Sequence, residues 1–175
     1  EESKTDLESI VDHTLRGFRA PTCEIDATAY NCLVESGYDY SSSVMPSIPI
    51  PGFYSANSDL PQTQVWLDID GRRLLEFPLA VAPGVRLPVS GAWIRILGRQ
   101  YTLRLIRHLS QKGVVCTYSH PWEFQSMNKP LPFRCRYRTG EWLWKTYDRL
   151  LNLDRDFVTY SQLCEQLNVE DTVSI

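Results

Sequence analysis

The spacing of apolar residues predicts three central helices. Apolar side chains recur at intervals of three and four residues in the segments of about 26–36, 101–112 and 141–153. Two capping-box patterns, Thr5–Glu8 and Thr159–Gln162, predict a further short helix towards each end of the chain. The buried stripe of the helix 141–153 would consist of Leu143, Tyr147, Leu150 and Leu151.

Short runs of β-branched and aromatic residues between these helices predict strands. One strand ends near Arg19, another covers residues 38–44, and a third, Gly113–Thr117, is apolar enough to be buried. Residues 65–76 alternate around Asp70-Gly71, a pair typical of two-residue hairpin turns. Alternation of helices and strands is typical of a parallel sheet with crossover helices.

The middle of the chain departs from this alternation. Four prolines between residues 46 and 61 predict a long loop, and a second strand pairing is expected between Phe77 and Gly98. Asp68 and Asp70 have the spacing of early calcium-loop ligands, but the carboxylate that completes such a loop is not at the required distance. A plain turn is therefore favoured there over a metal site.

Composition narrows the class of protein. The chain has 175 residues, 43% of them hydrophobic, which suffices for the core of one domain. Eighteen basic and twenty-one acidic residues give a net charge of −3, which favours neither nucleic acid nor an anionic membrane as a partner. We find no membrane-spanning run and no signal peptide in the sequence. The five cysteines form no Cys-x-x-Cys pair, so free thiols and a cytoplasmic location are favoured.

The segment Tyr118–Glu123 holds the strongest candidate for chemistry. His120 would follow the carboxyl end of a predicted strand, with Pro121 preventing further pairing and Trp122 beside it. Histidine changes its protonation near neutral pH, so an imidazole in this place can act as a general acid or base. From this segment alone, a buried histidine bonded to backbone is an equally good interpretation.

Several motifs, taken in order, resemble one known family. They are Gly17–Pro21, Gly37–Pro46, Leu75–Pro78, Leu87–Gly91 and Tyr118–Glu123. Their order and spacing resemble the carboxyl-terminal half of the polysaccharide deacetylases. The resemblance is to the exopolysaccharide-associated branch, which is similar to the chitin-oligosaccharide deacetylases of carbohydrate esterase family four.

The resemblance runs from about Thr14 to Tyr160 and implies an α/β fold. The expected architecture is the later part of a distorted (β/α) barrel of the polysaccharide deacetylase type, with a β-hairpin insertion at about residues 46–98. Members of that family bind a divalent metal, usually zinc, through an Asp-Asp pair and a His-x-x-x-His motif that precede the Arg-x-Pro motif. Neither pattern occurs here. We therefore expect residues 1–175 to be the carboxyl-terminal part of a deacetylase whose metal ligands lie in a missing amino-terminal half, and to be inactive alone.

The chemistry implied by the resemblance is hydrolytic removal of N-acetyl groups from a polysaccharide or oligosaccharide. His120 matches the general acid that protonates the leaving amine. Arg19 matches the arginine that orients the catalytic aspartate and keeps it ionised. The backbone after Pro21, at Thr22, matches the position that binds the oxyanion, although many members of the family carry tyrosine where this chain has Thr22.

Four more residues are candidates for substrate binding. Asp39 and Ser41 coincide with a family motif and would shape the sugar pocket, or else cap and turn a strand end. Trp122 would stack on a sugar ring, or pack beneath its own loop. Glu123 would contact the substrate, or pair with a nearby arginine.

Two other classes of function fit parts of the sequence. One is a non-catalytic carbohydrate-binding or structural remnant of a deacetylase. The other is binding of single-stranded nucleic acid by Phe133–Arg138, which interleaves basic and aromatic side chains. The net negative charge opposes the second, and we expect no nucleic-acid partner.

Overall fold

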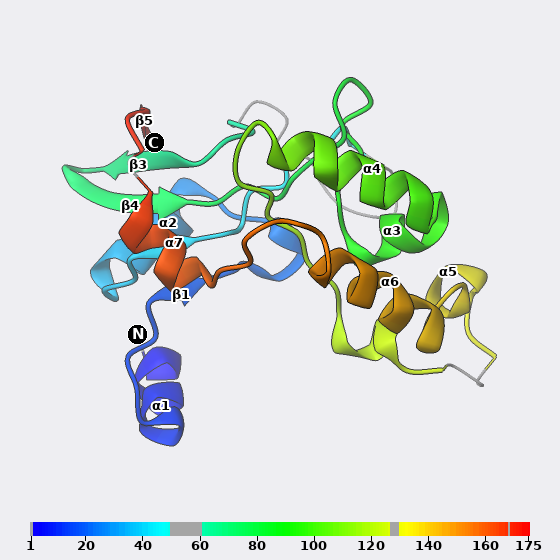
Figure 1. Ribbon diagram of the computed structural model, residues 1–175. Coiled ribbons are helices and arrows are strands. Elements are labelled where there is room, and N and C mark those ends of the chain that lie inside the picture. The colour runs from blue at the N-terminus through cyan, green and yellow to red at the C-terminus, as the bar shows by residue number, and fades with distance from the viewer. Residues whose placement is uncertain (1, 50–60, 127–129, 168) are drawn as a thin grey trace. The chain divides into compact units, whose positions relative to one another are not determined.

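The computed structural model shows a chain that divides into two units (Figure 1). Unit 1 consists of Glu1–Pro78 and Val158–Ile175, and unit 2 is the continuous segment Leu79–Phe157. Each unit has its own hydrophobic core. The structure describes residues 2–49, 61–126, 130–167 and 169–175.

Unit 1 is built on a five-stranded mixed sheet with the strand order β1-β2-β4-β3-β5. Among the described residues, three of the four strand pairs are parallel, and the pair of β3 with β4 is antiparallel. This parallel-rich sheet with helices confirms the predicted mixed α/β class. The strands are β1 (Gly17–Phe18), β2 (Tyr40–Ser41), β3 (Val65–Ile69), β4 (Arg72–Glu76) and β5 (Thr172–Ser174).

Strands β3 and β4 form the hairpin that the Asp-Gly pair indicated. Asp70 and Gly71 occupy the turn with φ angles of 51° and 78°, and the Gly71 amide donates to Asp68 Oδ1 at 2.9 Å. The Asp68 carboxylate thus serves the turn. Strand β4 also pairs in parallel with β2, so the hairpin lies within the main sheet. The assignment of residues 46–98 as an insertion stays a prediction, and residues 50–60 of the expected proline-rich loop lie outside the described residues.

The helices of unit 1 are set by their caps and by one long-range contact. Helix α2 (Ala27–Glu35) begins at Asp26, whose Oδ1 accepts from the Ala29 amide at 2.8 Å. The capping box that opens α7 (Tyr160–Gln166) is present as predicted, with the Gln162 amide donating to Thr159 Oγ1 at 3.2 Å. The unit also contains the single turn η1 (Pro21–Cys23).

The predicted start of the first helix was wrong. Helix α1 (Glu2–Val11) begins three residues before Thr5. The Lys4 ammonium donates to the carbonyls of Ser36 and Gly37, at 2.9 and 2.8 Å, at the end of α2. This tertiary contact orders the turn that the capping-box pattern had left outside the helix.

Unit 2 consists of helices joined by extended segments. Its core contains Val89, Leu103, Ile106 and Leu150, and Leu143 is also fully buried. Leu151, predicted in the same stripe, is instead 60% exposed. Its neighbour Leu150 occupies the inward position of that turn. The elements are α3 (Gly91–Leu97), α4 (Arg99–Ser110), η2 (Pro121–Phe124), α5 (Phe133–Arg136) and α6 (Glu141–Leu151).

Two predicted strand regions of unit 2 form isolated contacts in place of ladders. Gly113–Thr117 forms no regular strand in the part of the chain that the structure describes. Cys116 is buried and its carbonyl accepts from the Ala80 amide at 2.8 Å, Thr117 Oγ1 donates to the Val89 carbonyl, and Tyr118 forms a single bridge with Ser90. The pairing expected between Phe77 and Gly98 is reduced to one bridge, and its later part is helix α3. In the segment 77–98, Pro78, Pro83 and Pro88 lack the amide that a ladder requires.

None of the helices that the structure describes has the length and apolar character of a bilayer-spanning segment.

Glu76, at the end of β4, is a buried carboxyl group in unit 1 with an exposed fraction of 1%. Its Oε1 accepts from the amides of Ser43 and Val44 at 2.8 and 2.9 Å, and its Oε2 accepts from the Tyr30 hydroxyl at 3.3 Å. These donors are uncharged. Burial therefore outweighs the hydrogen bonds and raises the pKa of Glu76 above its usual value.

We predict that Glu76→Gln changes how stability depends on pH. Because the pKa of Glu76 is raised in the folded state, the protonated carboxyl makes its full contribution to wild-type stability below the unfolded pKa of about 4.5. This contribution is lost as the pH rises through the folded pKa. Glutamine does not titrate. The free energy of unfolding of Glu76→Gln, relative to wild type, should therefore increase from pH 4.5 to pH 8 in chemical denaturation.

Glu141→Gln is the control with the opposite sign. The hydrogen bond from Lys145 lowers the pKa of Glu141, so its contribution is present above the unfolded pKa and is lost as pH falls. The stability of this variant relative to wild type should therefore stay nearly level from pH 4.5 to pH 8 and should increase as the pH falls below 4.5. A difference for Glu76→Gln that stays level or decreases would contradict the prediction.

Candidate functional site

Arg19 connects three separate segments of unit 1. It follows β1, and its Nε donates to the Ser42 carbonyl at 2.8 Å while its Nη2 donates to Ser42 Oγ at 2.7 Å and to the Tyr160 hydroxyl at 2.8 Å. The guanidinium also lies over the Tyr160 ring, with Cζ 5.7 Å from the centroid. The Arg-x-Pro motif and the serine motif are thus held together, and helix α7 supplies a residue that the sequence had not indicated.

The residues after Arg19 form a strained turn. Thr22 and Cys23 have φ angles of 59° and 57°, in the left-handed region that a β-branched residue such as threonine rarely adopts. The turn is held by a bond from the Cys23 amide to the Ala20 carbonyl at 3.1 Å, and Thr22 Oγ1 donates to the Pro21 carbonyl at 2.6 Å. Pro21 and Thr22 are exposed. Strain of this kind clusters at functional sites, and it coincides here with the predicted oxyanion position.

The predicted substrate residues Ser41 and Asp39 differ in their surroundings. Ser41 is fully buried, and its Oγ donates to Ser43 Oγ at 2.8 Å, which in turn accepts from the Ala20 amide at 2.9 Å. Ser41 therefore supports the segment around Arg19 from below. Asp39 is exposed, and its Oδ2 accepts from Arg16 Nε at 2.6 Å.

His120 is an exposed imidazole between two aromatic rings of unit 2. Its ring stacks on Trp122, with centroids 5.9 Å apart and planes 16° apart, and it meets the edge of Tyr118 at 5.5 Å and 90°. Pro121 starts the single turn η2 directly after it. The alternative of a buried histidine is not what the structure shows, because the side chain is open to solvent.

A buried ion pair fixes the backbone on which His120 stands. Glu123 Oε2 accepts from the His120 amide at 2.8 Å, and Oε1 accepts from Arg95 Nε at 2.9 Å. The two side chains are 1% and 3% exposed. Arg95 Cζ lies 5.5 Å from the Trp122 ring centroid, and its Nη1 donates to the Tyr137 carbonyl at 2.7 Å. The carboxylate of Glu123 thus faces an arginine and the backbone, as in the second of the two interpretations of this residue.

Helix α3 approaches this pair closely. A Cβ placed on Gly91, the first residue of α3, would lie 2.2 Å from Glu123 Oε2 and 2.5 Å from Ser119 Oγ. Only glycine fits at that position. The Leu87–Gly91 motif therefore contributes a close approach to the ion pair and not a reactive group.

The described residues do not fit a divalent metal. Among them, no three or more side chains of His, Cys, Asp or Glu lie close enough together to hold a metal ion. All five cysteines are free, two of them are buried, and none belongs to such a group among the described residues.

The predicted site residues therefore form two sets, one in each unit. The structure brings Arg19, Pro21, Thr22 and Ser41 together in unit 1, and it brings His120, Trp122 and Glu123 together in unit 2. A pocket shared by Arg19 and His120 stays a prediction.

Comparisons with known proteins give a family and a fold. A family model described as "Domain of unknown function (DUF3473)" matches residues 42–165. No curated protein matches the chain. The 4-alpha-glucanotransferase from Thermococcus litoralis has a similar structure, with a TM-score of 0.67, 16% identity, and coverage of 99% of this chain and 26% of that chain.

A candidate polysaccharide deacetylase from Mycobacterium smegmatis is also similar in structure. Its TM-score is 0.55 at 21% identity, over 93% of this chain and 52% of that chain. At these identities the likeness is one of fold. The chain spans about a quarter and about half of the lengths of the two solved structures.

We predict that loss of the Glu123 carboxylate destabilises unit 2 strongly. Glu123→Ala leaves the Arg95 guanidinium buried without its anion, which costs about 3–5 kcal/mol of unfolding free energy. Removing both charges in Arg95→Met/Glu123→Leu should restore a large part of that loss. Chemical denaturation of the three proteins measures both effects.

The matched control is Glu141→Ala in the same unit. Glu141 pairs with Lys145 at 2.7 Å, but both side chains are more than half exposed. Water and salt screen an exposed pair, so Glu141→Ala should cost far less stability than Glu123→Ala. Equal losses for Glu123→Ala and Glu141→Ala would show that the buried pair does not hold the turn.

Proposed function

The chain belongs to the DUF3473 family, and from that premise we propose that it acts as part of a hydrolase that removes N-acetyl groups from a polysaccharide or oligosaccharide. The proposal is supported by the fold, which is similar to that of a candidate polysaccharide deacetylase. The observation that carries it is the Tyr118–Glu123 turn, which presents an exposed imidazole between two aromatic rings above a buried ion pair. Such an arrangement suits proton transfer to a large substrate at the surface.

In this proposal His120 is the general acid. Collapse of the tetrahedral intermediate requires a proton on the leaving amine nitrogen, and an exposed imidazole can deliver it. The stacking of the ring on Trp122 limits its rotation, and the bond from the His120 amide to Glu123 fixes the backbone beneath it. Proton transfer depends on such positioning.

Arg19 and the turn at Thr22 would supply the electrostatic groups. Arg19 has a permanent positive charge, which would keep a neighbouring catalytic aspartate ionised and oriented. Its bonds to Ser42 and Tyr160 fix the plane of the guanidinium. The left-handed turn at Thr22 would direct a backbone amide towards the developing oxyanion.

The proposed substrate contacts fall into two groups. Trp122 is 37% exposed and offers an aromatic surface to a sugar ring. Asp39 is exposed and would accept hydrogen bonds from sugar hydroxyls. Ser41 and Glu123 are buried and would act by holding the backbone of the site.

A divalent metal, with zinc as the expected ion, remains part of the proposal for the complete enzyme. Since the donors among the described residues do not fit a metal, its ligands would come from other parts of the protein.

We predict that His120→Ala slows acetate release by the complete protein about 10²-fold or more, with little change in KM. The loss should fall on kcat because the imidazole acts on the leaving group and not on ground-state binding. Release of acetate from N-acetylated chitin oligomers is the measurement.

His108→Ala is the matched control, because His108 is exposed on α4 of the same unit and belongs to no predicted site. It should leave acetate release unchanged. Equal rates for His120→Ala and wild type would remove His120 from the mechanism. Binding of the oligomers without any acetate release by wild type would favour the alternative of a carbohydrate-binding remnant.

A further inference from the structure

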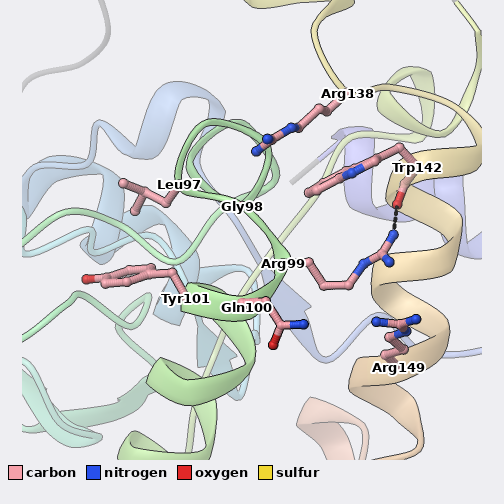
Figure 2. A pocket seen from close by; sticks show the side chains of 8 residues that line it. All are labelled: Leu97, Gly98, Arg99, Gln100, Tyr101, Arg138, Trp142 and Arg149. Carbon is pink, nitrogen blue, oxygen red and sulfur yellow. Dashed lines mark hydrogen bonds between the residues drawn. The ribbon is translucent and has the colours of Figure 1, made fainter.

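Unit 2 contains an open pocket that the proposed chemistry does not use. It has a volume of about 320 Å³ and lies between the start of α4 and helix α6 (Figure 2). This volume is at the lower end of the range for small-ligand sites. The polar and aromatic side chains that line it are Arg99, Gln100, Tyr101, Arg138, Trp142 and Arg149.

The pocket concentrates positive charge in a chain whose net charge is negative. Three of its lining residues are arginines, and no lining residue is acidic. Within the described part of the chain, no carboxylate forms an ion pair with Arg99, Arg138 or Arg149. The net charge of the whole chain is −3. Three guanidiniums around one cavity repel one another unless an anion lies between them.

Two of the arginines are fixed by neutral groups. Arg99 Nε donates to Thr146 Oγ1 at 3.0 Å, and its Nη2 donates to the Trp142 carbonyl at 3.2 Å. Arg138 Nη1 donates to the Arg95 carbonyl at 3.1 Å. These bonds hold the guanidiniums in place but leave their charges uncompensated.

The Trp142 ring separates the two fixed guanidiniums. Arg99 Cζ lies 5.3 Å and Arg138 Cζ 5.0 Å from the ring, and Figure 2 shows the two arginines on opposite sides of the indole. Arg149, on α6, lies on the Arg99 side and is exposed. The indole therefore keeps the guanidiniums of Arg99 and Arg138 apart, and these two groups cover its two faces.

The backbone at the pocket is strained where it places Arg138. Arg138 has a φ of 52°, in the left-handed region, and Gly98 has a φ of 89° at the junction of α3 and α4. A Cβ on Gly98 would lie 3.0 Å from Arg138 Nη1. A left-handed φ at a residue other than glycine is strained, and such strain is often found at ligand sites. Here the strained residue is Arg138, whose guanidinium lines the pocket.

We infer that this pocket binds an anionic group carried on a sugar chain, such as the carboxylate of a uronic acid or a sulfate ester. Guanidiniums pair with planar or tetrahedral oxyanions through two parallel hydrogen bonds. The exposed ring of Tyr101, 42% exposed at the rim, offers a surface for the sugar that carries the anion. The carbohydrate part of this inference rests on the proposed function, and the anionic part rests on the pocket alone.

Nucleic acid is the less favoured ligand. Arg138 belongs to the basic and aromatic segment Phe133–Arg138, but the two rings that its guanidinium contacts are already packed. Tyr137 lies 4.8 Å from Arg138 Cζ and stacks on Phe133, and Trp142 is contacted by both Arg99 and Arg138, so neither ring is free to stack on a base. The net charge of −3 also disfavours a polyanion that must lie along a large surface.

The test is calorimetric titration of the purified chain with oligogalacturonate, neutral chitin oligomers, inorganic sulfate and a single-stranded oligodeoxynucleotide. Oligogalacturonate should bind most tightly, and its affinity should fall with added salt. Arg149→Gln should weaken that binding about 10-fold, because it removes one charge-assisted contact from an exposed side chain. Arg107→Gln, two turns further along α4 and outside the pocket, should leave it unchanged.

Every other result would overturn the inference. If sulfate binds as tightly as oligogalacturonate, the carbohydrate part of the inference is wrong. If the oligonucleotide binds more tightly than oligogalacturonate and Arg149→Gln weakens that binding, the pocket is a nucleic-acid site. Equal effects of Arg149→Gln and Arg107→Gln, preferred binding of neutral oligomers, or no binding at all would show that the pocket does not recognise anions. Acetate release by the complete protein is measured separately, so failure of this inference is distinguishable from failure of the proposed function.

Discussion

A carboxylate that leaves water must have its oxygens bonded, and this requirement shapes both units of the chain. Glu123 in unit 2 binds a guanidinium and the His120 amide, while Glu76 in unit 1 binds two backbone amides and a tyrosine hydroxyl. A buried carboxylate oxygen without a hydrogen bond is costly. The two carboxylates therefore fix the backbone that they bond, at Ser43 and Val44 in unit 1 and at His120 in unit 2.

The two buried carboxylates differ in the groups that donate hydrogen bonds to them. Glu123 has a cation within 2.9 Å, and the ion pair is closed off by helix α3 at Gly91. Burial raises the pKa of Glu76, and its donors, which are all neutral, do not offset that effect. The turn below His120 is thus held by charge, whereas the serine segment below Arg19 is held by a network of hydroxyls and amides.

Local patterns predicted the elements that depend on local interactions. The Asp-Gly hairpin, the helix from about 26 to 36 and the Thr159 capping box all follow from turn, periodicity and capping preferences within a few residues. The predictions were wrong for elements that depend on distant contacts. The start of α1 is decided by Lys4 reaching the end of α2, and the expected strand 113–117 lacks a partner long enough for a ladder.

The candidate site shows the same division. The motif of six residues around His120 and the Arg-x-Pro motif identified the residues that stand out in the structure. The residues that hold these motifs in place could not be identified from the sequence. Arg95 lies 28 residues from its partner Glu123, and Tyr160 lies 141 residues from its partner Arg19. No periodicity or spacing links such pairs, and only the fold brings them together.

The division of unit 1 between the two ends of the chain affects how the protein is made. Strand β5 completes the sheet beside β3, with the Ile175 amide bonded to the Asp68 carbonyl at 3.1 Å. A ribosome must therefore finish all of residues 79–157 before unit 1 can close. Unit 2 is continuous in sequence and is free to fold first. While residues 79–157 are being synthesised, the β3 edge of the unit 1 sheet lacks its partner β5. Chaperones commonly bind exposed strand edges of this kind.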